Sequence, residues 1–178
     1  MYKNEIKKYE KKIEELENSF KHLTEYGVDY SFDENKFKEE MKQKTKEELK
    51  KILEELEENK LDDEMYEKDG ELEDKISSLK NTLENDIMSE SEFKKMCKAH
   101  KMSYDEEEDY RNQQEEIEEN FKSELDDVED LLKEAEELER EDKINEDKIF
   151  IVESMLKNIE EINKLENMEN KNSKLVKV

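Results

Sequence analysis

The chain has 178 residues and a formal net charge of −24, with 49% charged and only 31% hydrophobic residues. Ordinary globular proteins are about 25% charged and about 45–50% apolar, so a thick, round core is excluded, whereas helices that bury narrow apolar stripes remain possible. The absence of proline and the presence of only two glycines argue against a β-rich fold. The chain also lacks a long apolar run, so we expect it to have no membrane span and no signal peptide.

The first segment carries a regular seven-residue repeat of apolar residues, which a disordered chain would have no reason to keep. The repeat consists of Tyr2, Ile6, Tyr9, Ile13, Leu16, Phe20 and Leu23. Gly27 follows the last of these and is well placed to end a helix in the left-handed conformation. We therefore predict a helix over residues 2–26.

Two further helices are predicted on either side of the second glycine. Ser31 and Glu34 have the spacing of a capping box, which predicts a helix over residues 32–68. The heptad pattern resumes after Gly70 and predicts a helix over residues 71–88. Gly70 itself is compatible with a kink, a break or an exposed glycine within a helix.

Serine residues mark the start of the next two predicted helices. Ser89 and Glu92 form a second capping-box pattern before a short helix over residues 90–101. Ser103 is a potential cap for a long helix over residues 104–142. Apolar positions in that helix follow an approximately eleven-residue repeat, which is typical of a straight or slightly right-handed helix.

Asn145 is a potential cap for a last helix over residues 146–169, and residues 171–178 resemble a frayed basic tail. The run Ile149–Val152 is the most hydrophobic in the chain and is expected to be buried. Together these elements predict one all-α domain over residues 1–178, an elongated antiparallel helical bundle built from coiled-coil hairpins. We expect the first two helices to form one hairpin and the last two another.

Negative charge is concentrated in one of the predicted helices. Residues 103–142 contain 20 acidic and 4 basic residues, which is two thirds of the net charge of the chain. As a helix this segment would span about 60 Å, and its net charge would be spaced at about 3.7 Å, close to the roughly 3.4 Å between phosphates of a nucleic-acid strand. A positively charged groove built for phosphates would attract such a helix, although a solvated charged face would have the same composition. The candidate partner-binding residues are Asp105, Glu106, Glu107, Glu108, Asp109, Glu115, Glu116, Glu118, Glu119, Asp126, Asp127, Glu129 and Asp130.

The sequence lacks the constellations on which catalysis or cofactor binding usually depends. The two histidines, His22 and His100, are near no recognisable catalytic partner. Cys97 and His100 are one turn apart, but a structural zinc site needs four ligands and no second pair exists. We therefore predict a protein that is not an enzyme and binds neither a cofactor nor a metal, with Cys97 as a core or interface thiol. A basic segment around Lys94 could pair with the acidic helix, within the chain or in a dimer.

The leading hypothesis is a non-enzymatic inhibitor or binder that occupies the basic, nucleic-acid-binding surface of a partner protein. In composition, though in no specific motif, the chain is similar to phage anti-defence proteins, including some anti-CRISPR and anti-restriction proteins. The alternatives are a structural coiled-coil scaffold or oligomerisation protein and an acidic chaperone of basic proteins. Direct nucleic-acid binding is disfavoured by the net charge, and a homodimer through the heptad stripes is an alternative to intramolecular packing.

The single cysteine fits a reducing cytoplasm, so we expect a soluble cytoplasmic protein. The chain has 30 lysines but 2 arginines, a bias that suggests an AT-rich genome. The expected setting is therefore a low-GC bacterium or a phage-infected host cell.

Overall fold

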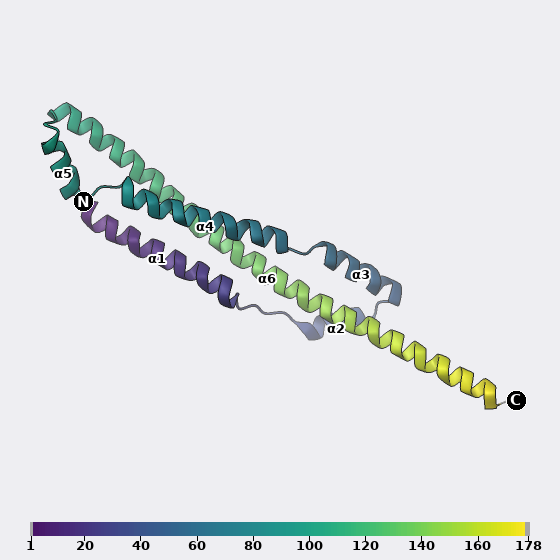
Figure 1. The fold of residues 1–178 in the computed structure, drawn as a ribbon. Coiled ribbons are helices and arrows are strands. Elements are labelled where there is room, and N and C mark those ends of the chain that lie inside the picture. The colour runs from purple at the N-terminus through teal and green to yellow at the C-terminus, as the bar shows by residue number, and fades with distance from the viewer. Residues whose placement is uncertain (1, 177–178) are drawn as a thin grey trace. The chain divides into compact units, whose positions relative to one another are not determined.

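The computed structural model describes residues 2–176, and the side chains of residues 6–171. This part of the chain is an all-α helical bundle, as predicted, and contains no strand. Its helices, labelled in Figure 1, are α1 (Tyr2–Tyr26), α2 (Glu34–Lys42), α3 (Lys46–Glu58), α4 (Asp62–Asn85), α5 (Glu90–Ala99) and α6 (Tyr104–Val176).

The chain forms two compact units, each built from two separate stretches of sequence. Unit 1 comprises residues 1–28 and 64–137, and unit 2 comprises residues 29–63 and 138–178. Helix α6 contributes its first part to unit 1 and its last part to unit 2.

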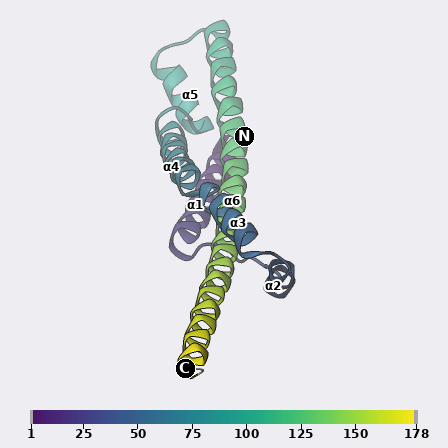
Figure 2. The ribbon, with the colours of Figure 1, turned by 90° about the vertical axis from the view of Figure 1, so that its right-hand side faces the viewer.

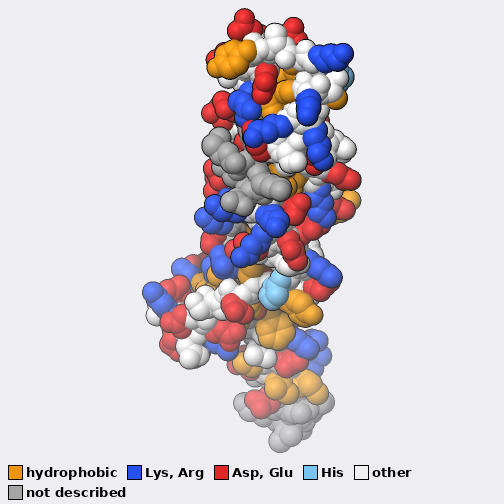
Figure 3. Space-filling model, turned by 90° about the vertical axis from the view of Figure 1, so that its left-hand side faces the viewer, with side chains coloured by type: hydrophobic (Ala, Val, Ile, Leu, Met, Phe, Trp, Pro, Cys, Tyr) orange, Lys and Arg blue, Asp and Glu red, His pale blue; other side chains and the backbone are white. Residues whose placement is uncertain are grey.

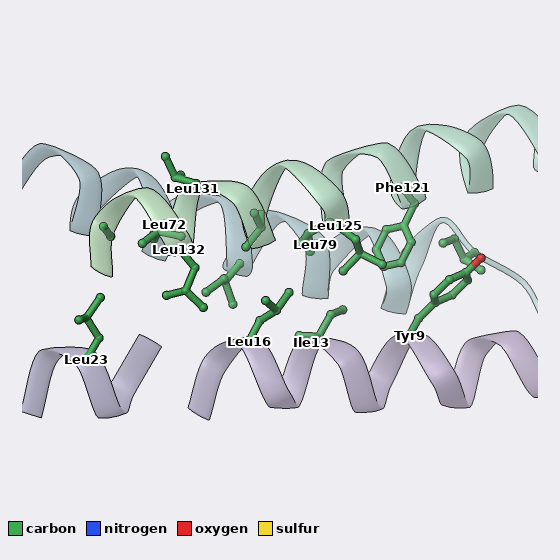
Figure 4. Packing of buried hydrophobic residues seen from close by; sticks show 14 residues of the cluster. Tyr9, Ile13, Leu16, Leu23, Leu72, Leu79, Phe121, Leu125, Leu131 and Leu132 are labelled. Carbon is green, nitrogen blue, oxygen red and sulfur yellow. The ribbon is translucent and has the colours of Figure 1, made fainter. Parts of the chain in front are cut away.

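The core of unit 1 is a three-helix layer formed by α1, α4 and the first part of α6 (Figures 1 and 2). Tyr9, Ile13, Leu16 and Leu23 of α1 point toward apolar residues of the other two helices (Figure 4). Helix α1 runs parallel to α6 and antiparallel to α4 (Figure 1). An ion pair links each two of these helices: Lys12–Glu129 joins α1 to α6, Lys80–Glu17 joins α4 to α1, and Lys68–Glu134 joins α4 to α6. The innermost side chains, at most 2% exposed, are Leu72, Leu79, Phe121, Leu125 and Val128.

This pairing differs from the predicted hairpins. Helix α1 packs within unit 1 against α4 and α6, not in a hairpin with the element that follows it in sequence. The last two predicted helices cannot form a hairpin, because residues 104–176 are one continuous helix. Its interior has neither proline nor glycine, so the capping potential of Asn145 does not end it. Residues 171–176, expected to belong to a frayed tail, continue the same helix, and residues 177–178 lie outside the described part.

The predicted helix over residues 32–68 is instead interrupted twice. Helix α2 begins after Asp33, whose carboxylate accepts a hydrogen bond from the Lys36 amide, so the cap is not Ser31 as predicted. Thr45 and Glu48 form a reciprocal capping box that starts α3. A capping box satisfies amide groups that an uninterrupted helix would bond internally, and it favours a new helix at this point.

Other predicted helix ends are confirmed. Gly27 has φ 72° and its amide donates to the Leu23 carbonyl at 3.0 Å. The hydroxyl groups of Ser89 and Ser103 accept hydrogen bonds from the amides of Glu92 and Glu106. These ends depend on local chemistry, which sequence reasoning captures well.

Gly70 is an exposed residue within α4. Of the three alternatives (a kink, a break or an exposed glycine within a helix), the third is therefore correct. A Cβ atom added there would have no other atom within 4 Å.

Glycine in a helix interior is less favourable than alanine by about 1 kcal/mol because it loses more backbone freedom on folding. We expect Gly70→Ala to raise the free energy of unfolding by about 0.5–1 kcal/mol in urea denaturation followed by circular dichroism. A loss of stability would show that this position needs the conformational freedom of glycine.

Unit 2 packs α2 and α3 against the last part of α6. Its buried centre is formed by Met41, Leu49 and Val152. The loop before α2 is held by the Tyr30 hydroxyl, which donates to Asp147 Oδ2 at 2.7 Å. No helix in the described part of the chain is both long and apolar enough to cross a bilayer.

Candidate partner-binding surface

Helix α6 buries one side of its first part in the core of unit 1. The residues on this side are Gln114, Glu118, Phe121, Leu125, Val128, Leu132 and Ala135. Each residue of a helix is rotated by about 100° from the one before it, so the position of any other side chain around α6 follows from this buried stripe.

Nine of the predicted carboxylates lie within roughly 120° of arc on the side of α6 opposite the buried stripe. All nine are exposed, and we call them the acidic face of α6: Asp105, Glu108, Asp109, Glu115, Glu116, Glu119, Asp126, Asp127 and Asp130. They are distributed over about 38 Å of helix, which is one carboxylate per roughly 4–5 Å. This spacing is close to that of phosphates along a nucleic-acid strand, about 3.4 Å. Because the opposite side of the helix is buried, these nine charges all lie on its exposed side.

The other four predicted residues do not lie on this face. Glu106 is exposed but projects toward one side of it. Glu107 and Glu129 are half-buried and form ion pairs with Arg111 at 3.8 Å and Lys12 at 3.1 Å.

Glu118 is a buried residue that contributes to the packing of unit 1. It is only 7% exposed, and its Oε1 atom accepts a hydrogen bond of 2.7 Å from the Tyr9 hydroxyl of α1. Lys122 lies 3.7 Å from the same oxygen. This carboxylate helps to hold α1 on α6 and is not accessible to a partner.

Few of the described side chains of unit 1 neutralise the acidic face. Of its nine carboxylates, only Asp126 forms an ion pair with a residue whose side chain is described, at 3.7 Å from Lys12 Nζ. Bases one turn away on a helix can offset such charge by forming ion pairs, but among the described side chains no other ion pair involves a carboxylate of the face. The face therefore presents nearly its full charge to solvent.

Helix α5 carries the basic segment and packs against the start of α6. Arg111 of α6 binds Glu90 of α5 at 3.2 Å and lies 4.6 Å from the centroid of the Phe93 ring. The hydrogen bond from Arg111 holds the pKa of the Glu90 carboxyl below its usual value. These contacts fix α5 without using its exposed lysines.

The lysines of this basic segment are Lys94, Lys95, Lys98 and Lys101, and all are exposed. None of them forms an ion pair with a described side chain, so the predicted pairing with the acidic helix within the chain is not present there. Figure 3 faces this end of unit 1 and shows basic and acidic side chains close together on its surface.

Cys97 is buried, as expected of a core thiol, and burial is the main reason that its pKa is raised. A thiol with a raised pKa is less reactive at neutral pH. Among the side chains that the structure describes, no group of three or more histidine, cysteine or carboxylate residues could hold a metal ion.

Sequence reasoning missed a second acidic site, in unit 2, where the buried carboxyl of Asp142 lines a groove. A signal for it exists in the sequence. Asp142 continues the seven-residue series of Val128, Ala135 and Ile149, and it is the only polar member. A charged residue in an apolar series is a candidate for a functional position.

No protein-family model matches the chain, and neither does any curated protein or solved structure. The charge distribution and the packing of the helices are therefore the basis for a functional proposal.

Proposed function

We propose that the protein is a non-enzymatic binding or inhibitory protein whose acidic face of α6 occupies the basic, nucleic-acid-binding surface of a partner protein. The observation that supports this proposal is the arrangement of nine exposed carboxylates on one side of a helix, of which only Asp126 is paired with a described base. Mutual repulsion of these charges opposes helix formation. A partner that supplies positive charge would relieve this cost.

The physical mechanism is electrostatic recognition. A row of carboxylates at nearly phosphate spacing would be attracted to a groove that normally contacts the sugar–phosphate backbone, because such grooves use lysine and arginine without reading base sequence. The long-range attraction would accelerate the encounter of the two proteins and weaken as salt is added. In this setting, inhibition results from exclusion of the nucleic acid and requires no chemistry.

The proposal is tested by reversing the charge of five residues of the face: Asp105, Glu108, Asp109, Glu115 and Glu116, each to lysine. We expect pull-down of the partner from host lysate to fall by at least about ten-fold, since several charge contacts at about 1 kcal/mol or more each would be lost. Excess duplex DNA or RNA should compete with the unaltered protein for the same partner.

The matched control reverses five exposed acids of α3, in unit 2: Glu47, Glu54, Glu55, Glu57 and Glu58. This variant has the same net charge as the first. Equal loss of binding in the two variants would show that only the total charge matters. Binding that is unaffected by the first variant, or by competing nucleic acid, would contradict the proposal.

A second candidate function, a coiled-coil scaffold, is favoured by a separate observation. Near the end of α6 the side chains of Ile162, Leu165 and Met168 are 54%, 61% and 61% exposed. The stripe of α1, by contrast, is buried in unit 1, so substitutions at Ile13 or Leu16 would disturb folding and would not report on assembly. A homo-oligomer that persists at 1 M salt and dissociates on Ile162→Asp, measured by sedimentation, would favour the scaffold. We place either function in the cytoplasm of a low-GC bacterium or a phage-infected host cell.

A further inference from the structure

Unit 2 contains a groove of about 220 Å³ between the connection from α3 to α4 and the last part of α6. Four carboxylates line it, together with one lysine, one asparagine and two apolar side chains of α6. The residues that matter for its chemistry are Lys60, Asp62, Asp142, Glu146, Phe150 and Glu153. The groove belongs to unit 2, whereas the acidic face of α6 belongs to unit 1.

Asp142 is the unusual member of this group, because it is only 7% exposed and has no basic partner among the described side chains. Its one hydrogen-bonding side chain is Glu146, another carboxyl, and Asp62 and Glu139 add further negative charge. Lys143 lies 3.8 Å from Glu146, and Lys60 forms no ion pair with any described carboxylate. Burial, followed by these neighbouring acids, raises the pKa of Asp142. The buried carboxyl of Asp142 is thus surrounded by acidic groups and has no positively charged partner among the described side chains.

The apolar part of the groove indicates which kind of cation would fit. Phe150 is 71% exposed although it is a large aromatic side chain, and Ile149 lies beside it in the groove. Aromatic faces attract ammonium and guanidinium groups, and lysine and arginine side chains place their methylene groups on apolar surface while the charged end reaches a polar partner. A metal ion does not fit, because no group of described side chains provides the necessary ligands.

We propose that this groove binds a lysine or arginine side chain of a partner protein, with the cationic end on Asp142 and Glu146 and the aliphatic stem on Phe150. The bound cation supplies the positive charge that the buried carboxyl lacks in the free protein. Recognition here is of one side chain, whereas the acidic face of α6 would recognise an extended basic surface.

The experiment is a titration of the full chain with n-butylguanidinium, followed by NMR shifts, with the neutral isostere n-butylurea as the matched probe. We expect saturable shifts at Asp142, Glu146 and Phe150 with n-butylguanidinium and none with n-butylurea. Asp142→Asn should weaken binding by at least about ten-fold, because it removes the charged partner of the cation, and Phe150→Ala should weaken it less. Lys60→Ala should strengthen binding, because Lys60 is the lysine that lines the groove and competes with the probe for its carboxylates.

The control variant is Glu160→Gln, an exposed carboxylate of unit 2 that does not line the groove; its binding should match that of the unaltered chain. Binding should also strengthen as the pH is raised from acidic to neutral, because the proton leaves Asp142, whose pKa is raised by burial and by the neighbouring Glu146, Asp62 and Glu139. The other charged groups at or beside the groove are Lys60, Lys143 and Glu153. Equal shifts with the two probes, or unchanged binding in Asp142→Asn, would overturn the proposal and show only unspecific attraction of cations. Because the probes are small molecules, this outcome is independent of whether the acidic face of α6 binds a partner.

Discussion

Phe121→Ala is expected to lower the free energy of unfolding of unit 1 by about 3–5 kcal/mol. The Phe121 side chain is 1% exposed, and its ring meets that of Tyr9 edge to face with centroids 5.0 Å apart. Removal of the ring leaves a cavity between α1, α4 and α6 and also removes the aromatic contact. A loss of this size is a large fraction of the roughly 5–15 kcal/mol that stabilises a typical domain, so a shift in the midpoint of urea denaturation measured by circular dichroism should be clear.

Tyr104→Ala provides the matched control for this substitution. It removes an aromatic ring from the same helix, but Tyr104 is 80% exposed, so its effect should stay within about 0.5 kcal/mol. If Phe121→Ala were no more destabilising than Tyr104→Ala, this would contradict the packing of Phe121 in the three-helix core of unit 1.

The helical class and several helix ends could be predicted because they depend on residues close together in sequence. The heptad of α1 occurs where expected, and Gly27, Ser89 and Ser103 act at the ends assigned to them. Composition alone made strands improbable. These signals are local, and a short stretch of chain contains all of the information.

The partners of each helix could not be predicted in the same way. A heptad stripe shows which side of a helix is buried, but any other stripe of similar width can cover it. The chain pairs α1 with α4 and α6, while the hairpin prediction relied on adjacency in sequence. Asn145 illustrates the same limit, since a residue that can cap a helix can also lie within one when the helix on both sides is stabilised by packing.

The candidate surface was partly predictable for a related reason. The acidic composition of residues 103–142 identified the helix, but the sequence alone could not separate exposed from buried carboxylates. Glu118 is removed from the set by a hydrogen bond to Tyr9, which is 109 residues away. The face emerges only when the buried side of α6 is known.

Asp142→Asn is expected to raise the free energy of unfolding at pH 7 by about 1–2 kcal/mol. This is the usual cost of burying a polar group whose interactions with water are not fully replaced. The carboxylate is buried near Glu146, Asp62 and Glu139, and each of these disfavours its charged form. The amide keeps the shape of the side chain and removes the charge. Glu160→Gln, an exposed change of the same kind in unit 2, should leave stability within about 0.5 kcal/mol of the original.

The advantage of Asp142→Asn should depend on pH in a defined direction. The pKa of Asp142 is higher in the folded chain than in the unfolded chain, so between these two values the folded state holds more protons. As pH rises through this window the unaltered protein loses stability, and the asparagine variant does not. The difference between the two, measured by urea denaturation, should therefore be greatest near pH 7 and shrink toward pH 4. A difference that grows on acidification, or a variant less stable at pH 7, would mean that the folded chain favours the charged form of Asp142, contrary to the surroundings of the groove.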